Sequence, residues 1–156
     1  MGVVEMEVEE VLEYEYEEIT DAGIVLREGR AGYSTRGYDF DDVTGAIIGC
    51  ALEVHRTLGP GFREIVYQRA LALELQAAGL EFEREVKVPI IYKGHQIDTR
   101  RADFVVENVM VEIKARSQVA LEDYVQALNY VKASGFKLGL LLNFGASRLQ
   151  IKRLAN

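Results

Sequence analysis

Cysteine is nearly absent from the sequence. The single residue, Cys50, excludes an internal disulfide framework and any metal site built from several cysteines. No apolar run is as long as the roughly 18 residues of a membrane span. The N-terminus also lacks the charged and then apolar pattern of an export signal. The sequence therefore predicts a soluble, unexported protein with no membrane partner, most simply located in the cytoplasm.

Internal repeats and low-complexity linkers are missing as well, and 49% of the 156 residues are hydrophobic, which fits one globular domain with a core. The charge is uneven. Residues 1–42 hold 13 Asp and Glu against 3 Lys and Arg, a net of −10, whereas residues 43–156 hold 12 against 15, a net of +3. The overall charge of −7 argues weakly against a polyanionic partner, but the charge of residues 43–156 alone does not.

The acidic N-terminal segment has no clear period. Val4 and Val8 are spaced as on a helix, whereas Tyr14 and Tyr16 alternate as in a strand. We interpret residues 1–41 as an appended arm, with a hairpin around "EGRAG" at 28–32, and the pattern leaves its order undecided.

From Asp41 onward the apolar spacing predicts regular elements. The second of these, a helix, carries apolar residues almost all round and should be largely buried. The order α, α, β, β, β, α, β, β predicts an α/β domain over residues 42–156, with a mixed sheet and helices packed on it. The expected elements are helices at about 41–58, 62–78 and 121–133, strands at 82–92, 96–106 and 109–115, a buried strand in 137–144 and an edge strand in 147–154.

Two acidic residues meet across the second and third strands. If the hairpin turns at Glu107 and Asn108, Asp103 lies opposite Glu112, and two opposed carboxylates repel. Lys114 shares the strand face of Glu112 and could neutralise the pair in an ordinary charged ladder. Alternatively, both carboxylates and a backbone carbonyl hold Mg²⁺, and Lys114 orients or activates an attacking water.

Three further residues have both a structural and a functional interpretation. Glu64 lies in the first turn of the second helix, where a carboxylate is favourable without any ligand. Gln126 and Tyr130 are spaced i, i+4 on the third helix, so they form either a packing pair or an amide and a phenol beside a nucleotide. Local chemistry leaves these alternatives open.

Taken together, these residues resemble a known family. "GFREIVY" at 61–67 is similar to the GxxExxY signature of a group of small bacterial proteins in the PD-(D/E)XK nuclease superfamily. The surrounding "GAIIGCALEVHRTLGPGFREIVYQRALALEL" and "LGLLLNFGASRLQIKRL" extend the resemblance over nearly all of residues 42–156. The acidic arm lies outside it.

The resemblance implies a restriction-endonuclease-like α/β fold, a mixed central sheet flanked by helices. It also implies a Mg²⁺ or Mn²⁺ site and a helix motif of the QxxxY type at Gln126 and Tyr130 for binding the substrate. By this match Lys114 supports the nucleophilic water, and the metal ligands are Glu64, Asp103, Glu112 and the backbone carbonyl of Ile113.

Two classes of function follow from these observations. The leading hypothesis is a metal-dependent nuclease acting on nucleic acid, with DNA favoured. The other is a catalytically silent module of the same fold that binds nucleic acid or a protein, with the arm as its interaction segment; self-inhibition by the arm and a homodimer stay open. Arg100 and Arg101 precede Asp103; one of them could contact a phosphate, but both are interpreted as exposed strand-end residues and are not assigned to the site. His55 is interpreted as a partner of the dipole at a helix C-terminus or as a hydrogen-bonded core residue.

Overall fold

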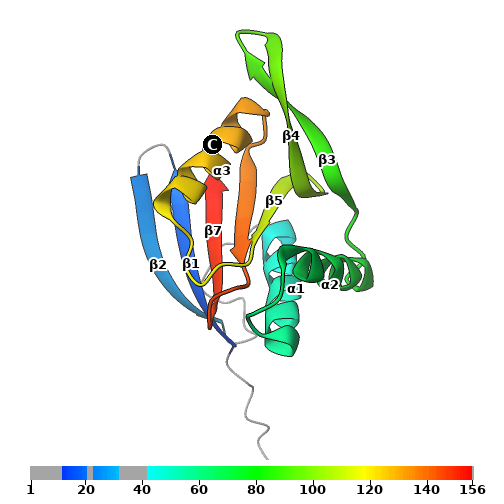
Figure 1. Cartoon of the computed structure of the whole chain (residues 1–156), viewed down its shortest axis with the longest axis vertical. Helices are drawn as coiled ribbons and strands as arrows, with labels where there is room; N and C mark the ends of the chain where they lie inside the picture. Colours follow the sequence, from blue (N-terminus) through cyan, green and yellow to red (C-terminus); the bar gives the residue numbers. More distant parts are fainter. Residues whose placement is uncertain (1–11, 21–22, 32–41, 156) are drawn as a thin grey trace, which may run out of the picture.

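The chain forms one seven-stranded sheet with helices on both faces (Figure 1). The computed structural model describes residues 12–20, 23–31 and 42–155. The elements in chain order are β1 (Leu12–Thr20), β2 (Gly23–Ala31), α1 (Asp42–Leu58), α2 (Glu64–Ala77), β3 (Phe82–Tyr92), β4 (His95–Val106), β5 (Val109–Lys114), α3 (Leu121–Ala133), β6 (Leu138–Asn143) and β7 (Leu149–Ala155).

The sheet is mixed, with the strand order β2-β1-β7-β6-β5-β4-β3. Hairpin neighbours β3 and β4, β4 and β5, β6 and β7, and β1 and β2 are antiparallel. Strands β5 and β6 are parallel, because α3 carries the chain back across the sheet between them. Strands β3 to β7 with the three helices give the predicted α/β class, which is confirmed.

Each face of the sheet has its own core. On one face α1 and α2 contribute Ile47, Ala51 and Leu71 to a cluster with the inner residues of β5, β6 and β7. On the other face α3 packs Ala127 and Val131 against the sheet. Figure 1 shows α3 crossing one side of the sheet, with α1 and α2 away from it. Successive side chains along each central strand therefore point alternately into one core and into the other.

The connection between α1 and α2 explains where α2 begins. Gly59 and Gly61 have φ values of 66° and 109°, a region that favours glycine, so the helix starts only at Glu64. Tyr67 is fully buried, and its hydroxyl donates to the Gly59 carbonyl (2.6 Å) and accepts the Phe62 N–H (3.2 Å). The tyrosine of the "GFREIVY" stretch therefore holds the loop that precedes Glu64.

Three expectations from the sequence are wrong. Helix α2 is not largely buried, because only one side of it contacts the sheet; Leu73 is 68% exposed. Strand β7 is not an edge strand, because β1 pairs with it in parallel. The arm does form a hairpin, but residues 28–31 of "EGRAG" lie inside β2, which follows β1 after residues 21–22. Residues 1–11 and 32–41 of the predicted arm lie outside the described residues.

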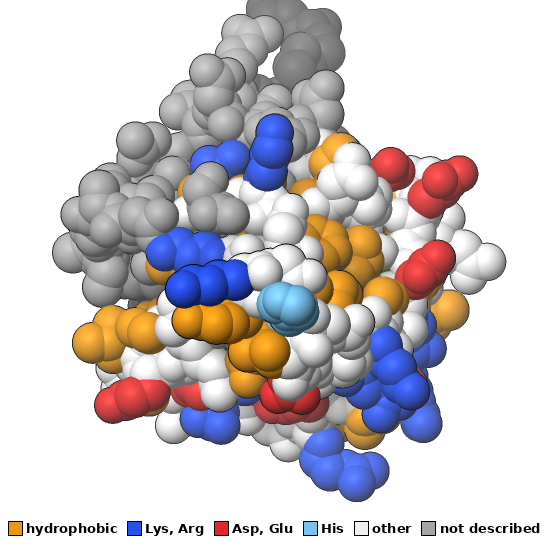
Figure 2. All heavy atoms as spheres, turned by 90° about the horizontal axis from the view of Figure 1, so that it is seen from above, with side chains coloured by type: hydrophobic (Ala, Val, Ile, Leu, Met, Phe, Trp, Pro, Cys, Tyr) orange, Lys and Arg blue, Asp and Glu red, His pale blue; other side chains and the backbone are white. Residues whose placement is uncertain are grey.

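The far half of the β3–β4 hairpin projects beyond the rest of the sheet (Figure 1), since β5 pairs only with Phe104, Val105 and Val106 of β4. Its end carries exposed Ile91, Tyr92 and Ile97. Figure 2, in which this end of the molecule faces the viewer, shows exposed hydrophobic side chains with Lys and Arg side chains near them. A search of the described residues for a helix that is apolar and long enough to cross a membrane found none.

Candidate functional site

The regular alternation of β4 breaks at Asp103. Phe104 and Val106 point into the core of α1 and α2, whereas Ala102, two residues before Phe104, points into the core of α3. The pairing with β3 skips Asp103 and Glu85, and Glu85 has a φ of 53°. On the other side, the pairing of β4 with β5 ends at Phe104. Asp103 therefore occupies a gap in both ladders.

The Asp103 carboxylate fills that gap. Its Oδ2 accepts the backbone N–H of Ile113 in β5 at 2.8 Å, a bond that a strand carbonyl would normally accept. Its Oδ1 lies 3.4 Å from Nε2 of Gln68, a buried residue of α2, and Arg84 Nη2 donates to Gln68 Oε1 at 2.8 Å. The carboxylate is thus held in place by a backbone amide of β5 and a side chain of α2.

Glu112 lies beside Asp103, as the predicted hairpin register requires, because Phe104 pairs with Val111. It is 5% exposed. Oε2 is 3.3 Å from Arg100 Nη2, and Oε1 is buried without a hydrogen-bond partner among the described residues. Burial and the neighbouring Asp103 carboxylate raise the pKa of Glu112 to about 7, although Arg100 opposes the shift.

Arg100 is a site residue that the sequence analysis left without a role. Its guanidinium carbon lies 3.9 Å from the centre of the Tyr130 ring, in a cation–π contact, while Nη2 reaches Glu112. Regular alternation would put Arg101 on the face of Asp103 and Arg100 on the opposite one. The break at Asp103 reverses this, and Arg101 instead forms an exposed ion pair with Glu85 at 2.8 Å. Two opposed carboxylates on neighbouring strands were the available signal that an arginine nearby would be needed.

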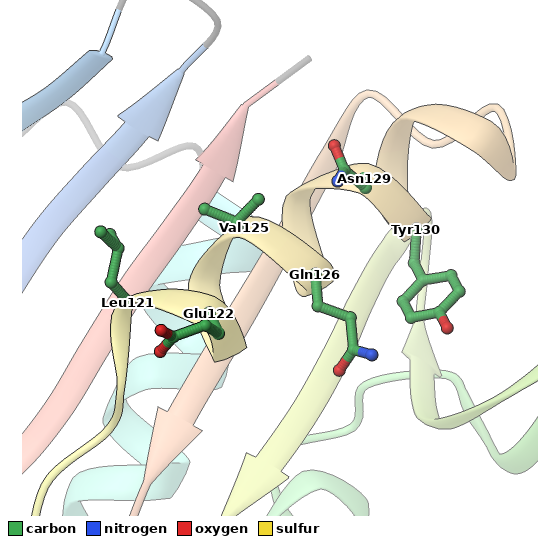
Figure 3. Close-up of a pocket in the computed structure, with 6 residues that line it drawn as sticks. All are labelled: Leu121, Glu122, Val125, Gln126, Asn129 and Tyr130. Carbon is green, nitrogen blue, oxygen red and sulfur yellow. The ribbon is translucent and has the colours of Figure 1, made fainter.

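Three further predicted residues, Lys114, Gln126 and Tyr130, lie on the α3 side of the sheet. Lys114 is half-buried at the end of β5, two residues after Glu112, and parity places both on the α3 face. Gln126 is exposed and Tyr130 half-buried on α3. Figure 3 shows both pointing to one side of α3, away from the side to which Val125 and Asn129 point. A shallow groove of about 510 Å³ runs along the helix, lined by Leu121, Glu122, Val125, Gln126, Asn129 and Tyr130.

Glu64 does not join the two strand carboxylates. It is exposed at the first residue of α2, one turn before Gln68, whose amide contacts Asp103. Across the described ranges, no three side chains of His, Cys, Asp or Glu are grouped as a metal site. Glu64 therefore lies along the helix from the centre and outside it.

A buried asparagine fixes the chain where it leaves β5, and sequence reasoning missed it. Asn143 of β6 is fully buried; its Nδ2 donates to the Arg116 carbonyl (2.8 Å) and to Gln150 Oε1 (2.8 Å), and its Oδ1 accepts the Arg116 N–H (2.9 Å). Gly145 packs so closely that an added Cβ would lie 2.3 Å from Arg116 N. The hydrogen bonds of Asn143 and the close packing of Gly145 hold the segment that follows Lys114. His55 bonds to the Ala146 carbonyl (2.9 Å) in the same region, as expected for a hydrogen-bonded histidine.

The donor set at the centre fits a hard divalent cation. Two carboxylates lie side by side, and that of Glu112 has a raised pKa and a buried Oε1 with no hydrogen-bond partner within the described ranges. Oxygen ligands of this kind, few in number and supplemented by water, are what Mg²⁺ prefers. Asp103 and Glu112 are the residues that could hold it.

A scan against protein-family models agrees with this geometry. The model of the PD-(D/E)XK nuclease superfamily matches residues 41–154, well over half of the chain. The comparisons with curated proteins and with solved structures each found no match. The chain belongs to the PD-(D/E)XK nuclease superfamily.

Proposed function

From this membership we propose that the chain is a Mg²⁺- or Mn²⁺-dependent nuclease that hydrolyses phosphodiester bonds, with DNA as the favoured substrate. The observation that carries the proposal is the pair of Asp103 and Glu112: the two carboxylates lie together, and Glu112 Oε1 is buried with no partner among the residues that the structure describes. Burying two such groups together is costly unless a cation completes the site. The resemblance of "GFREIVY" to the GxxExxY group is the finer family assignment that we propose with it.

In this proposal Asp103, Glu112 and the Ile113 carbonyl hold the cation, and Glu64 is assigned as a further ligand from the resemblance. A bound Mg²⁺ supplies Lewis-acid polarisation of a phosphate and a more acidic water. Asp103 is well suited to a fixed ligand position, because the Ile113 N–H already orients its carboxylate. Glu64 is exposed and free of the core, so its side chain can turn toward a ligand.

The roles of the other residues follow from their positions. Lys114 is on the same strand face as Glu112, where its ammonium would orient the attacking water or offset the charge of the phosphate. Gln126 and Tyr130 lie on the same side of α3 (Figure 3), and Tyr130 contacts Arg100, which in turn contacts Glu112. We assign Gln126 and Tyr130 to positioning of the strand to be cut.

The proposal is tested by cleavage assays on single- and double-stranded DNA and RNA with Mg²⁺ or Mn²⁺. Asp103→Asn keeps an oxygen for the Ile113 N–H, and Lys114→Ala removes the ammonium; each should lower the cleavage rate at least about a hundredfold. Asp98→Asn in the exposed part of β4 and Lys87→Ala in β3 are the matched controls and should cleave normally. If the wild-type protein cuts none of these substrates with either metal, the enzymatic proposal fails.

A catalytically silent module is the second candidate, and one contact favours it. Arg100 already lies against Glu112, so its guanidinium balances part of the negative charge without a metal ion. Such a module would bind nucleic acid or a protein partner, with the acidic arm as interaction segment. A melting-temperature shift with Mn²⁺ that Asp103→Asn removes favours the nuclease, whereas no Mn²⁺ effect favours the module.

A further inference from the structure

The contact between Arg100 and Glu112 is poorly built for a permanent ion pair. An arginine fork and a carboxylate normally form two parallel hydrogen bonds of about 2.8 Å. Here a single approach of 3.3 Å joins Nη2 to Oε2, while Arg100 Nε and Glu112 Oε1 are both buried without hydrogen-bond partners in the described part of the chain. Two unsatisfied buried atoms make the pair a weak contributor to stability.

Arg100 has a second contact that does not depend on Glu112. Its guanidinium carbon lies over the Tyr130 ring, 3.9 Å from the ring centre, and its side chain is 22% exposed. An arginine that loses the carboxylate can thus remain on the aromatic ring. The neighbouring Arg101 lacks this arrangement, because its ion pair with Glu85 is a short contact at the surface.

We propose that Arg100 is a displaceable counter-ion of the site: it holds Glu112 while no metal is bound and releases the carboxylate to an incoming divalent cation. This inference rests on the proposed metal site at Asp103 and Glu112. A dication and a guanidinium against the same buried carboxylate would repel each other, so the two compete for it. Once released, Arg100 stays on Tyr130 at the edge of the site, where its guanidinium is available to a phosphate of the substrate.

Metal affinity of the whole chain tests the competition. Arg100→Met keeps the stem and removes the charge, and free Mn²⁺ is measured by electron paramagnetic resonance during a titration. We expect Arg100→Met to bind Mn²⁺ about tenfold more tightly than the wild type, because the competitor is gone. The control Arg101→Met removes one charge from the next residue and should leave the affinity unchanged. Adding Asp103→Asn to Arg100→Met should abolish the gain.

A measurement on the wild-type protein keeps the test independent of how Arg100→Met folds. The Nε–Hε resonance of Arg100, identified by its loss in Arg100→Lys, should shift when Mg²⁺ is added, and that of Arg101 should not. Equal Mn²⁺ affinity of wild type and Arg100→Met, with binding still abolished by Asp103→Asn, overturns the role of Arg100 and leaves the nuclease proposal standing. Absence of Mn²⁺ binding in the wild type and in Arg100→Met overturns both.

Discussion

The two faces of β5 differ in what they contribute: one packs in an apolar core, and the other carries the charged residues of the candidate site. Val109, Val111 and Ile113 point into the core of α1 and α2 and are all buried among apolar side chains. On the opposite face, Met110 is followed by Glu112 and Lys114, which point toward α3. The apolar face stabilises the fold, and the polar face reduces stability while it prepares a binding site. Substitutions on the two faces should therefore act in opposite directions.

The apolar face should show the largest loss of stability. Ile113→Ala removes three carbons from a side chain that is 2% exposed, and we expect the free energy of unfolding to fall by about 2–5 kcal/mol. Urea unfolding measures the change. Leu73→Ala on the exposed side of α2 is the control and should change it by about 0.5 kcal/mol at most. A small effect of Ile113→Ala would mean that the apolar face of β5 contributes little to stability.

The polar face should show the reverse, through pH. Because the folded state raises the pKa of Glu112 from 4.5 to about 7, ionisation of this group costs stability of about 3 kcal/mol, a loss that develops as the pH rises from about 4.5 to 7. The metal-free protein should therefore be more stable at pH 5 than at pH 8 as far as this group is concerned.

Glu112→Gln isolates that contribution, because glutamine resembles the protonated acid at every pH. We expect this variant to unfold at higher urea than the wild type at pH 8, to match it near pH 4.5 and to lose metal-dependent cleavage. Glu85→Gln, in the exposed pair with Arg101, should leave the pH profile of the wild type unchanged. If the stability of the wild type depends on pH in the same way as that of Glu112→Gln, the raised pKa of Glu112 is contradicted.

The end of β5, where the two faces meet the following loop, should show an intermediate effect. Asn143→Ala leaves the partly buried N–H of Arg116 without its acceptor, and we expect the free energy of unfolding to fall by about 1–3 kcal/mol. Cleavage should fall further than stability explains, because Lys114 precedes this loop. Asn129→Ala on the exposed side of α3 deletes the same amide as a control. Thermal melting and single-turnover cleavage separate the two effects.

The smallest effect should come from the exposed pair beside the site. Arg101→Met breaks the contact with Glu85, in which the side chains are 64% and 48% exposed, and should lower stability by less than about 1 kcal/mol. The change is measured in low and high salt, and it should shrink as salt rises. A loss as large as that of Ile113→Ala would show that the Arg101–Glu85 pair belongs to the core.

Much of the fold was predictable because the apolar periods are strong. The spacing from Val43 to Leu58 predicted α1 closely, and the connector at Glu107 and Asn108 set the register that brings Asp103 to Glu112. The predictions failed where contacts between residues distant in the sequence determine the structure. Leu73 has the right period for a buried residue, but α2 presents it to solvent. The pairing of β1 with β7 joins segments that no local pattern connects.

The placement of Asp103 beside Glu112 was predictable from the sequence, whereas the contact of Arg100 with Glu112 was not. Asp103, Glu112 and Lys114 stand out as charges inside apolar strands, which single residues reveal. Arg100 could not be assigned, because its face depends on the break in alternation at Asp103, and that break arises from the positive φ of Glu85 on the partner strand. The metal and the roles of its proposed ligands Glu64, Asp103 and Glu112 remain predictions, as do the roles of Lys114, Gln126 and Tyr130.

The bond from the Ile113 N–H to Asp103 has one more consequence. Most strand amides are protected from hydrogen exchange by backbone carbonyls, but this amide is protected by the carboxylate of a proposed metal ligand. Its exchange rate should therefore change when a cation binds to Asp103. The amides of its neighbours in β5 should report only the opening of the sheet. The exchange rate of the Ile113 amide thus reports on the occupancy of the site in the absence of any substrate.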